Sequence, residues 1–218
     1  MNNKSLKLDV PMQEVCSRFG ATKSTINKMW QTPSKVDSGN ATRKFPRKSF
    51  IDLTHDRFNA QFSPGDKLDT VQGKVLEKID HLLQWEMLSG PEVLSSRKDV
   101  KVISLHDWCR GVMLESATRA FFGERILKID PDFISDLITF DDDNWMFSFE
   151  IPPMFSAKAK RVCDANSKMV EALTKYFTLP IEERPGAAWM LQTFEVEMRE
   201  LDIGNQQIAS MIALMYWM

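Results

Sequence analysis

The sequence predicts an all-α protein, and three observations carry that prediction. Apolar residues recur at helical spacing in segment after segment of the 218-residue chain. No stretch shows sustained alternation of apolar and polar residues, and β-branched residues do not cluster. The hydrophobic share is 43%, enough for a chain of this length to bury a substantial core. We therefore expect one helical domain over residues 1–218.

The first half of the chain is expected to hold four helical segments. Two short helices are predicted over 11–30 on either side of Gly20, and a flexible loop over 32–46, which is polar and contains two prolines and a glycine. The next predicted helix, over 48–61, ends at a Ser-Pro-Gly sequence. A further helix begins at Leu68 and ends before Gly90, with five residues on one apolar face: Val71, Val75, Ile79, Leu82 and Leu83.

A long helix is predicted to begin after Ser104, which is a plausible N-cap with Asp107 three residues on, and to end at Gly123. Its expected buried face consists of Leu105, Trp108, Cys109, Val112, Met113, Ser116 and Ala120. The dipeptide Asp130-Pro131 predicts the start of the next helix, because an acidic N-cap followed by proline favours helix initiation.

The last third of the chain is expected to form three more helices. The predicted ranges are 156–177, 186–201 and 205–218. The first of them buries Val162, Met169, Leu173 and Phe177. The last begins with polar residues and becomes strongly apolar.

Charge and composition exclude several classes of function. The net charge of −2 argues against a nucleic-acid partner, and no apolar run is long enough to predict a membrane span. The three cysteines, Cys16, Cys109 and Cys163, show no CxxC spacing, so we expect reduced, buried thiols and no metal site. The chain alone is expected to be intracellular and soluble.

Catalytic motifs are not recognisable. The sequence contains no GxGxxG, P-loop, HExxH or GxSxG pattern, and His55, His81 and His106 have no second ligand at metal spacing. Three adjacent carboxylates at 141–143 point in different directions on a helix, so a solvated helix end is the better interpretation than a metal site.

Residues 14–30 match the pattern of a helix-turn-helix. Cys16 occupies the small buried position, Gly20 makes the turn and Ile26 packs the second helix. Thr22, Lys23, Ser24 and Thr25 would then open a recognition helix. Because no extended basic patch accompanies them, two helices of a larger helical domain are the preferred interpretation.

Several longer stretches resemble the cytochrome P-450 family, in particular a fungal group distantly similar to sterol 7α-hydroxylase and prostacyclin synthase. Residues 102–110 and 117–123, the latter ending in Phe-Phe-Gly, resemble the region around helix E. Residues 131–145 resemble helix F, 179–186 the connection of helices G and H, and 205–218 the first half of helix I. The resemblance covers about residues 14–218.

The resemblance implies a partial P-450 fold that lacks the haem-thiolate loop, the ExxR motif and most of the β-sheet. The parent activity would be monooxygenation of a small lipophilic substrate, with haem as cofactor and a P-450 reductase as partner, in a family usually found at the endoplasmic-reticulum membrane. His55 and Arg57 are candidate contacts for a haem propionate. The candidate substrate-pocket residues are Trp145, Phe147, Met211, Leu214, Met215 and Tyr216.

None of the three cysteines lies in the loop sequence that supplies the family's haem ligand. We therefore expect a truncated P-450-like domain that is inactive alone. Two alternatives remain open: a stand-alone helical module that binds a ligand or a partner chain, and a small helix-turn-helix DNA-binding regulator.

Overall fold

The computed structural model describes residues 9–32, 48–90 and 92–217. Most of the predicted flexible loop at 32–46 lies outside the described residues.

The described residues are mostly helical, as predicted. The α-helices are α1 (Asp9–Arg18), α2 (Lys23–Trp30), α3 (Phe50–Phe62), α4 (Asp66–Leu82), α5 (Leu105–Phe122), α6 (Arg125–Ile129), α7 (Phe133–Ser148), α8 (Ala157–Thr178), α9 (Trp189–Glu200) and α10 (Asn205–Trp217). Short 3-10 helices occur at η2 (Trp85–Met87), η3 (Pro153–Phe155) and η4 (Ile181–Glu183).

Side-chain caps explain where several helices begin. Ser49 and Asp52 form a reciprocal capping box at the start of α3, and the Ser156 hydroxyl accepts a hydrogen bond at the start of α8. Ser104 is the N-cap residue of α5, but its hydroxyl donates to the Asp107 carboxylate at 2.6 Å and does not accept from the helix backbone. Helices α3, α5 and α8 begin within two residues of their predicted starts.

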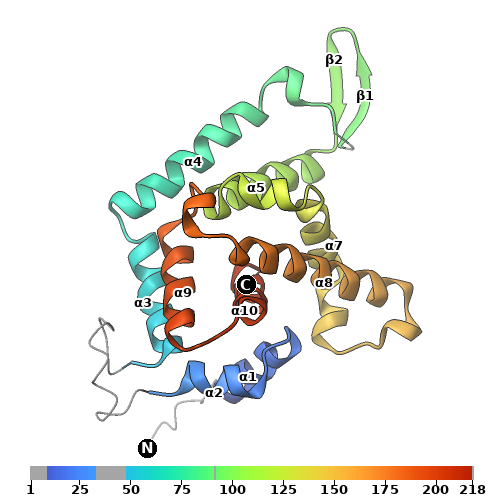
Figure 1. Ribbon diagram of the computed structural model, residues 1–218. Coiled ribbons are helices and arrows are strands. Elements are labelled where there is room, and N and C mark those ends of the chain that lie inside the picture. Colours follow the sequence, from blue (N-terminus) through green and yellow to red (C-terminus); the bar gives the residue numbers. More distant parts are fainter. Residues whose placement is uncertain (1–8, 33–47, 91, 218) are drawn as a thin grey trace, which may run out of the picture.

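A β-hairpin that the sequence analysis missed joins η2 to α5. Strand β1 (Val93–Arg97) pairs antiparallel with β2 (Val100–Ile103), and the hairpin projects from the end of the helical body (Figure 1). Most of its side chains are exposed. Because strands this short pair only with each other, they leave little of the alternating pattern that marks a half-buried sheet.

Helix α10 lies at the centre of the fold, with α8 and α9 beside it (Figure 1). Every residue from Ile208 to Leu214 is buried, so this helix is covered around its whole circumference, and all of these residues except Ser210 are apolar. The predicted inner face of α8 is confirmed, since Val162, Met169, Leu173 and Phe177 are all buried.

The predicted inner face of α5 is wrong over its first half. Leu105 and Met113 are 66% and 55% exposed, whereas Thr118 and Phe122 are buried. Apolar residues surround this helix almost evenly, so its periodicity does not single out one face. Cys109 is exposed for the same reason, and Cys163 is half-buried, which leaves Cys16 as the buried thiol that was expected.

Two further boundaries differ from the prediction. Helix α7 begins at Phe133 with Asp132 as its N-cap residue, because Asp130 terminates α6 and its carboxylate accepts a hydrogen bond from the Asp132 backbone N–H. Helix α4 ends at Leu82, where η2 follows, well before Gly90.

Candidate functional site

An apolar cavity of about 360 Å³ lies among five helices. Its lining residues come from α3, α5, α7, α9 and α10: Phe58, Phe62, Leu114, Ala117, Phe121, Phe122, Leu137, Asp141, Met190, Leu191, Phe194, Ile212, Met215, Tyr216 and Trp217. Two lining residues, Phe62 at the C-terminal end of α3 and Asp141 in the middle of α7, are exposed. The cavity therefore meets solvent at these two positions. A cavity of this kind suits a small organic ligand.

Aromatic rings dominate the walls of the cavity. The centroid of the Phe121 ring lies 6.2 Å from that of Phe62 and 6.3 Å from that of Tyr216. The centroids of the Phe58 and Phe194 rings lie 5.8 Å apart. These edge-to-face and tilted contacts hold the walls in place and leave ring faces and edges available to an apolar guest.

The two polar groups of the lining, the Tyr216 hydroxyl and the Asp141 carboxylate, already have hydrogen-bond partners. The Tyr216 hydroxyl donates to the Thr118 hydroxyl at 2.8 Å, because the Thr118 hydroxyl itself donates to the Leu114 carbonyl at 2.7 Å. Burial raises the pKa of Tyr216 to about 12 and keeps the phenol neutral. Asp141 accepts a hydrogen bond from Arg110 at 2.8 Å.

The structure brings two of the six predicted pocket residues, Met215 and Tyr216, to this cavity. Met211 and Leu214 are buried elsewhere in the core around α10. Phe147 packs against Phe19 with ring centroids 5.1 Å apart, and Trp145 is 49% exposed. Helix phase alone therefore identified two of the lining residues on α10, Met215 and Tyr216.

Sequence reasoning missed the contributions of α3, α5 and α9. Phe58 and Phe62, one turn apart on α3, and the adjacent pair Phe121 and Phe122 were visible as aromatic clusters. Their spacing was compatible with ordinary core packing. Only the tertiary arrangement shows that they converge with α10.

The candidate propionate contacts lie outside the cavity lining. His55 is exposed on α3. The Arg57 guanidinium donates to the Glu197 carboxylate at 2.8 Å through Nε, and it lies over the Trp189 ring at 5.9 Å. This ion pair fastens α3 to α9, and its two side chains are only 13% and 11% exposed.

The described residues do not fit a haem-thiolate centre. Cys16 is buried in the core, where desolvation raises its pKa to about 11 and disfavours the thiolate. Burial also raises the pKa of Cys163, and Cys109 lies exposed on α5. None of the three lines the apolar cavity. A haem would need its axial thiolate from another source.

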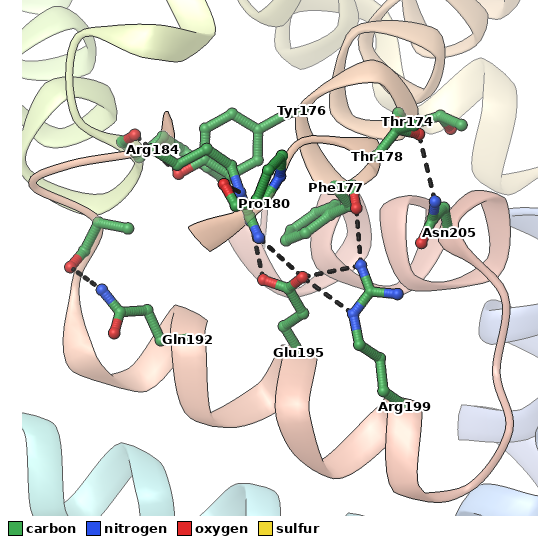
Figure 2. A network of polar contacts seen from close by, with 12 residues as sticks. Thr174, Tyr176, Phe177, Thr178, Pro180, Arg184, Gln192, Glu195, Arg199 and Asn205 are labelled. Carbon is green, nitrogen blue, oxygen red and sulfur yellow. Dashed lines mark hydrogen bonds and ion pairs between the residues drawn. The ribbon is translucent and has the colours of Figure 1, made fainter. Parts of the chain in front are cut away.

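A second polar centre, shown in Figure 2, lies between α8, η4 and α9. Glu195 receives hydrogen bonds from Arg184 and Arg199, each with an Nη2–Oε1 distance of 2.8 Å. Arg199 also donates to the Phe177 carbonyl at 2.6 Å, and Arg184 lies 4.8 Å from the Tyr176 ring centroid. The carboxylate is thus held between two guanidinium groups, which suits it to a structural role rather than to proton transfer.

This centre positions one wall of the cavity. Glu195 and Glu197 connect α9 to its neighbours, and Met190, Leu191 and Phe194 on the same helix line the cavity. The two buried carboxylates therefore fix the orientation of three lining residues.

Residues 14–30 form two helices around Gly20, as predicted. The Gln207 side chain bridges the turn: its amide nitrogen donates to the Gly20 carbonyl at 2.9 Å, and its oxygen accepts from the Thr22 backbone N–H at 2.8 Å. Lys28 donates to the Asp202 carbonyl at 2.7 Å. Thr25 is buried, so one of the four residues at the start of the second helix does not face solvent.

The acidic triplet lies inside α7, at a kink where Asp143 departs from helical geometry, and not at a helix end. Arg110 pairs with Asp141 and Asp142, and Lys158 lies 3.6 Å from Asp143. Within residues 9–32, 48–90 and 92–217, no group of histidine, cysteine and acidic side chains has the arrangement of a metal site.

Comparisons of the chain with protein-family models, with curated proteins and with solved structures found no match. None of the helices that the structure describes has both the length and the apolar character needed to cross a membrane.

Proposed function

We propose that the chain binds a small lipophilic molecule in the aromatic cavity, as the substrate-binding helical half of a P-450-like monooxygenase fold. The observation that carries the binding proposal is the cavity of about 360 Å³ lined by residues from five helices. The family proposal rests on the sequence resemblance over residues 14–218.

The pairing of the polar lining groups favours an apolar ligand. Tyr216 already donates to Thr118, and Asp141 already accepts from Arg110. A polar ligand would lose its hydration without gaining equivalent partners, whereas an apolar one gains contacts with the rings.

The oxidative step belongs to the parent activity that the resemblance implies. Haem, when bound by a thiolate, would supply activation of O₂ with electrons from a reductase. The residues of this chain are proposed to bind and enclose the substrate, and the positions of the three cysteines predict that the chain alone does not oxidise it.

The binding proposal is tested by filling the cavity. Ala117 lines it from α5, and Ala117→Leu adds volume there without adding charge. We expect the wild-type chain to bind the fluorescent probe 1-aminoanthracene and the variant to bind it at least about tenfold more weakly, measured by fluorescence titration. The matched control is Ala157→Leu, at an exposed position at the start of α8.

The binding proposal fails if the wild-type chain does not bind the probe, or if both variants bind it equally well while remaining folded by circular dichroism. Titration with haem followed by reduction under CO tests the cofactor argument separately. We expect no thiolate-type absorption band, and such a band would show that one of the cysteines is a ligand after all. Genomic sequence that encodes an ExxR helix and a cysteine loop after Met218 would support the P-450 assignment over a stand-alone module.

A further inference from the structure

The hydroxyl of Tyr216 is a polar group in the wall of the aromatic cavity, and its ring is held in place by two neighbours. Tyr216 lines the cavity from α10. Its ring meets that of Phe122 edge-to-face with the centroids 5.1 Å apart, and that of Phe121 with the centroids 6.3 Å apart. Both phenylalanines line the cavity as well. These contacts fix the orientation of the phenol ring and thus the position of its oxygen.

Two consecutive hydrogen bonds decide which way the Tyr216 hydroxyl can act. Thr118 is buried, and its hydroxyl has a single proton, which it donates to the Leu114 carbonyl at 2.7 Å. Because a carbonyl cannot donate, the 2.8 Å contact between Thr118 and Tyr216 uses the phenolic proton. The Tyr216 oxygen is left with a lone pair, so toward a ligand it is a hydrogen-bond acceptor.

This acceptor is uncharged. Burial raises the pKa of Tyr216 to about 12, so the phenol is neutral at physiological pH. A neutral acceptor in an apolar wall suits an uncharged donor such as an alcohol or a phenol. A ligand ether or ketone can only accept, and it would have to take the phenolic proton away from the buried Thr118 oxygen.

We propose that the cavity recognises an apolar ligand with a single hydroxyl group, which donates a hydrogen bond to the Tyr216 oxygen. The inference rests on the proposed function, because it assigns a specificity-determining residue and a ligand class to the same site. A ligand hydroxyl loses its hydration when it enters the cavity, and the bond to Tyr216 offsets that loss. One such group is therefore compatible with walls that are otherwise aromatic.

Competition with 1-aminoanthracene tests the inference with two ligands of the same skeleton. 2-Naphthol can donate a hydrogen bond, whereas 2-methoxynaphthalene can only accept one. We expect Tyr216→Phe to weaken the binding of 2-naphthol at least about fivefold and to leave that of 2-methoxynaphthalene within about twofold. The affinity of the probe is measured first for each variant, so that the two ligands are compared on the same scale.

The matched control is Tyr176→Phe. It removes the other of the two tyrosine hydroxyls of the chain, which donates to the Phe122 carbonyl at 2.9 Å and does not belong to the cavity lining. We expect this variant to bind both ligands within about twofold of the wild type, since the wall at Tyr216 is unchanged.

Thr118→Val tests the direction of the hydrogen bond. It removes the acceptor of the phenolic proton and nearly preserves the shape of the side chain, so Tyr216 becomes able to donate to a ligand. We expect 2-methoxynaphthalene to gain at least about threefold in affinity relative to 2-naphthol, compared with the wild type. A change in cavity shape alone would move both affinities in the same direction.

The outcomes separate this inference from the proposed function. If folded Tyr216→Phe weakens both ligands equally or neither of them, or if Thr118→Val leaves their ratio unchanged, this inference is overturned while binding in the cavity stands. If neither ligand nor the probe binds the wild-type chain, both proposals are overturned. Circular dichroism establishes that each variant is folded, and Thr118→Val decides the question if Tyr216→Phe does not fold.

Discussion

Arg184 and Glu195 form the most deeply buried ion pair among the described residues, with side chains 3% and 2% exposed. Removing one partner of such a pair strands the other charge in the interior. Glu195→Gln should therefore lower the free energy of unfolding by about 3 kcal/mol or more, measured by urea denaturation.

The matched control for that change is Glu171→Gln. Glu171 forms an i,i+4 pair with Lys175 on the exposed face of α8, where solvent already surrounds both groups. We expect no measurable change in stability. Equal effects of the two substitutions would contradict the structural role given to Glu195.

Single residues were the hardest scale to predict from the sequence. Glu195 and Arg184 are charged residues that composition places at the surface, and nothing in their spacing indicates burial. The ion pair of Arg57 was equally hard to predict. Its predicted role as a propionate contact rested on sequence position alone, and the structure pairs it with Glu197. Partners 140 residues apart leave no local pattern.

The C-terminal end of α5 requires a glycine at position 123. Gly123 has φ of 70°, and a Cβ there would lie 2.4 Å from the Pro185 carbonyl oxygen. Gly123→Ala should therefore destabilise the protein by at least about 2 kcal/mol, because it adds backbone strain to a clash between two chain segments.

Gly73 offers the opposite case within α4. Its position is helical and has no neighbouring atom within 4 Å of an added Cβ. Gly73→Ala should raise stability by about 0.5–1 kcal/mol, since alanine has the higher helix propensity. Thermal denaturation of both variants checks the contrast, and a stable Gly123→Ala would contradict the close approach to Pro185.

At the scale of elements the sequence was most informative. The predicted ranges 48–61, 156–177 and 205–218 agree with α3, α8 and α10 to within two residues, because helical periodicity and stop signals such as Ser-Pro-Gly are local. The hairpin β1–β2 was missed, since its few residues pair only with each other. The buried face of α5 was misplaced because apolar residues surround that helix.

At the scale of the whole molecule, buried phenols and one thiol make stability depend on alkaline pH. Burial raises the pKa of both Tyr176 and Tyr216 to about 12 and that of Cys16 to about 11. The folded state therefore resists ionisation while the unfolded chain ionises. The contribution of these three neutral groups to the free energy of unfolding is therefore fully present below about pH 9, and it is lost as the pH rises toward about 12.

Tyr176 alone should account for about 2–3 kcal/mol of that loss. Urea unfolding measured at several alkaline pH values checks this, and Tyr176→Phe should make the dependence shallower by about one proton. An unchanged slope would show that Tyr176 already ionises in the folded protein.

The cavity illustrates why the site could be predicted only in part. Its lining comes from five helices, and a single sequence does not say which helices meet. Helix phase identified Met215 and Tyr216, but the same reasoning also selected Met211 and Leu214, which face the core. The aromatic residues of α3 and α9 join the site only through tertiary packing.

The contact between Gln207 and the turn at Gly20 has a consequence for synthesis on the ribosome. The two residues are 187 positions apart, so α1 and α2 emerge long before the helix on which they dock. At typical elongation rates this delay amounts to roughly 10–40 s. During that time two side chains that are buried in the folded protein, Phe19 directly after α1 and Met29 on α2, lack their final covering. The apolar surface of this helix pair therefore stays without its α10 partner until residues 205–217 have been made.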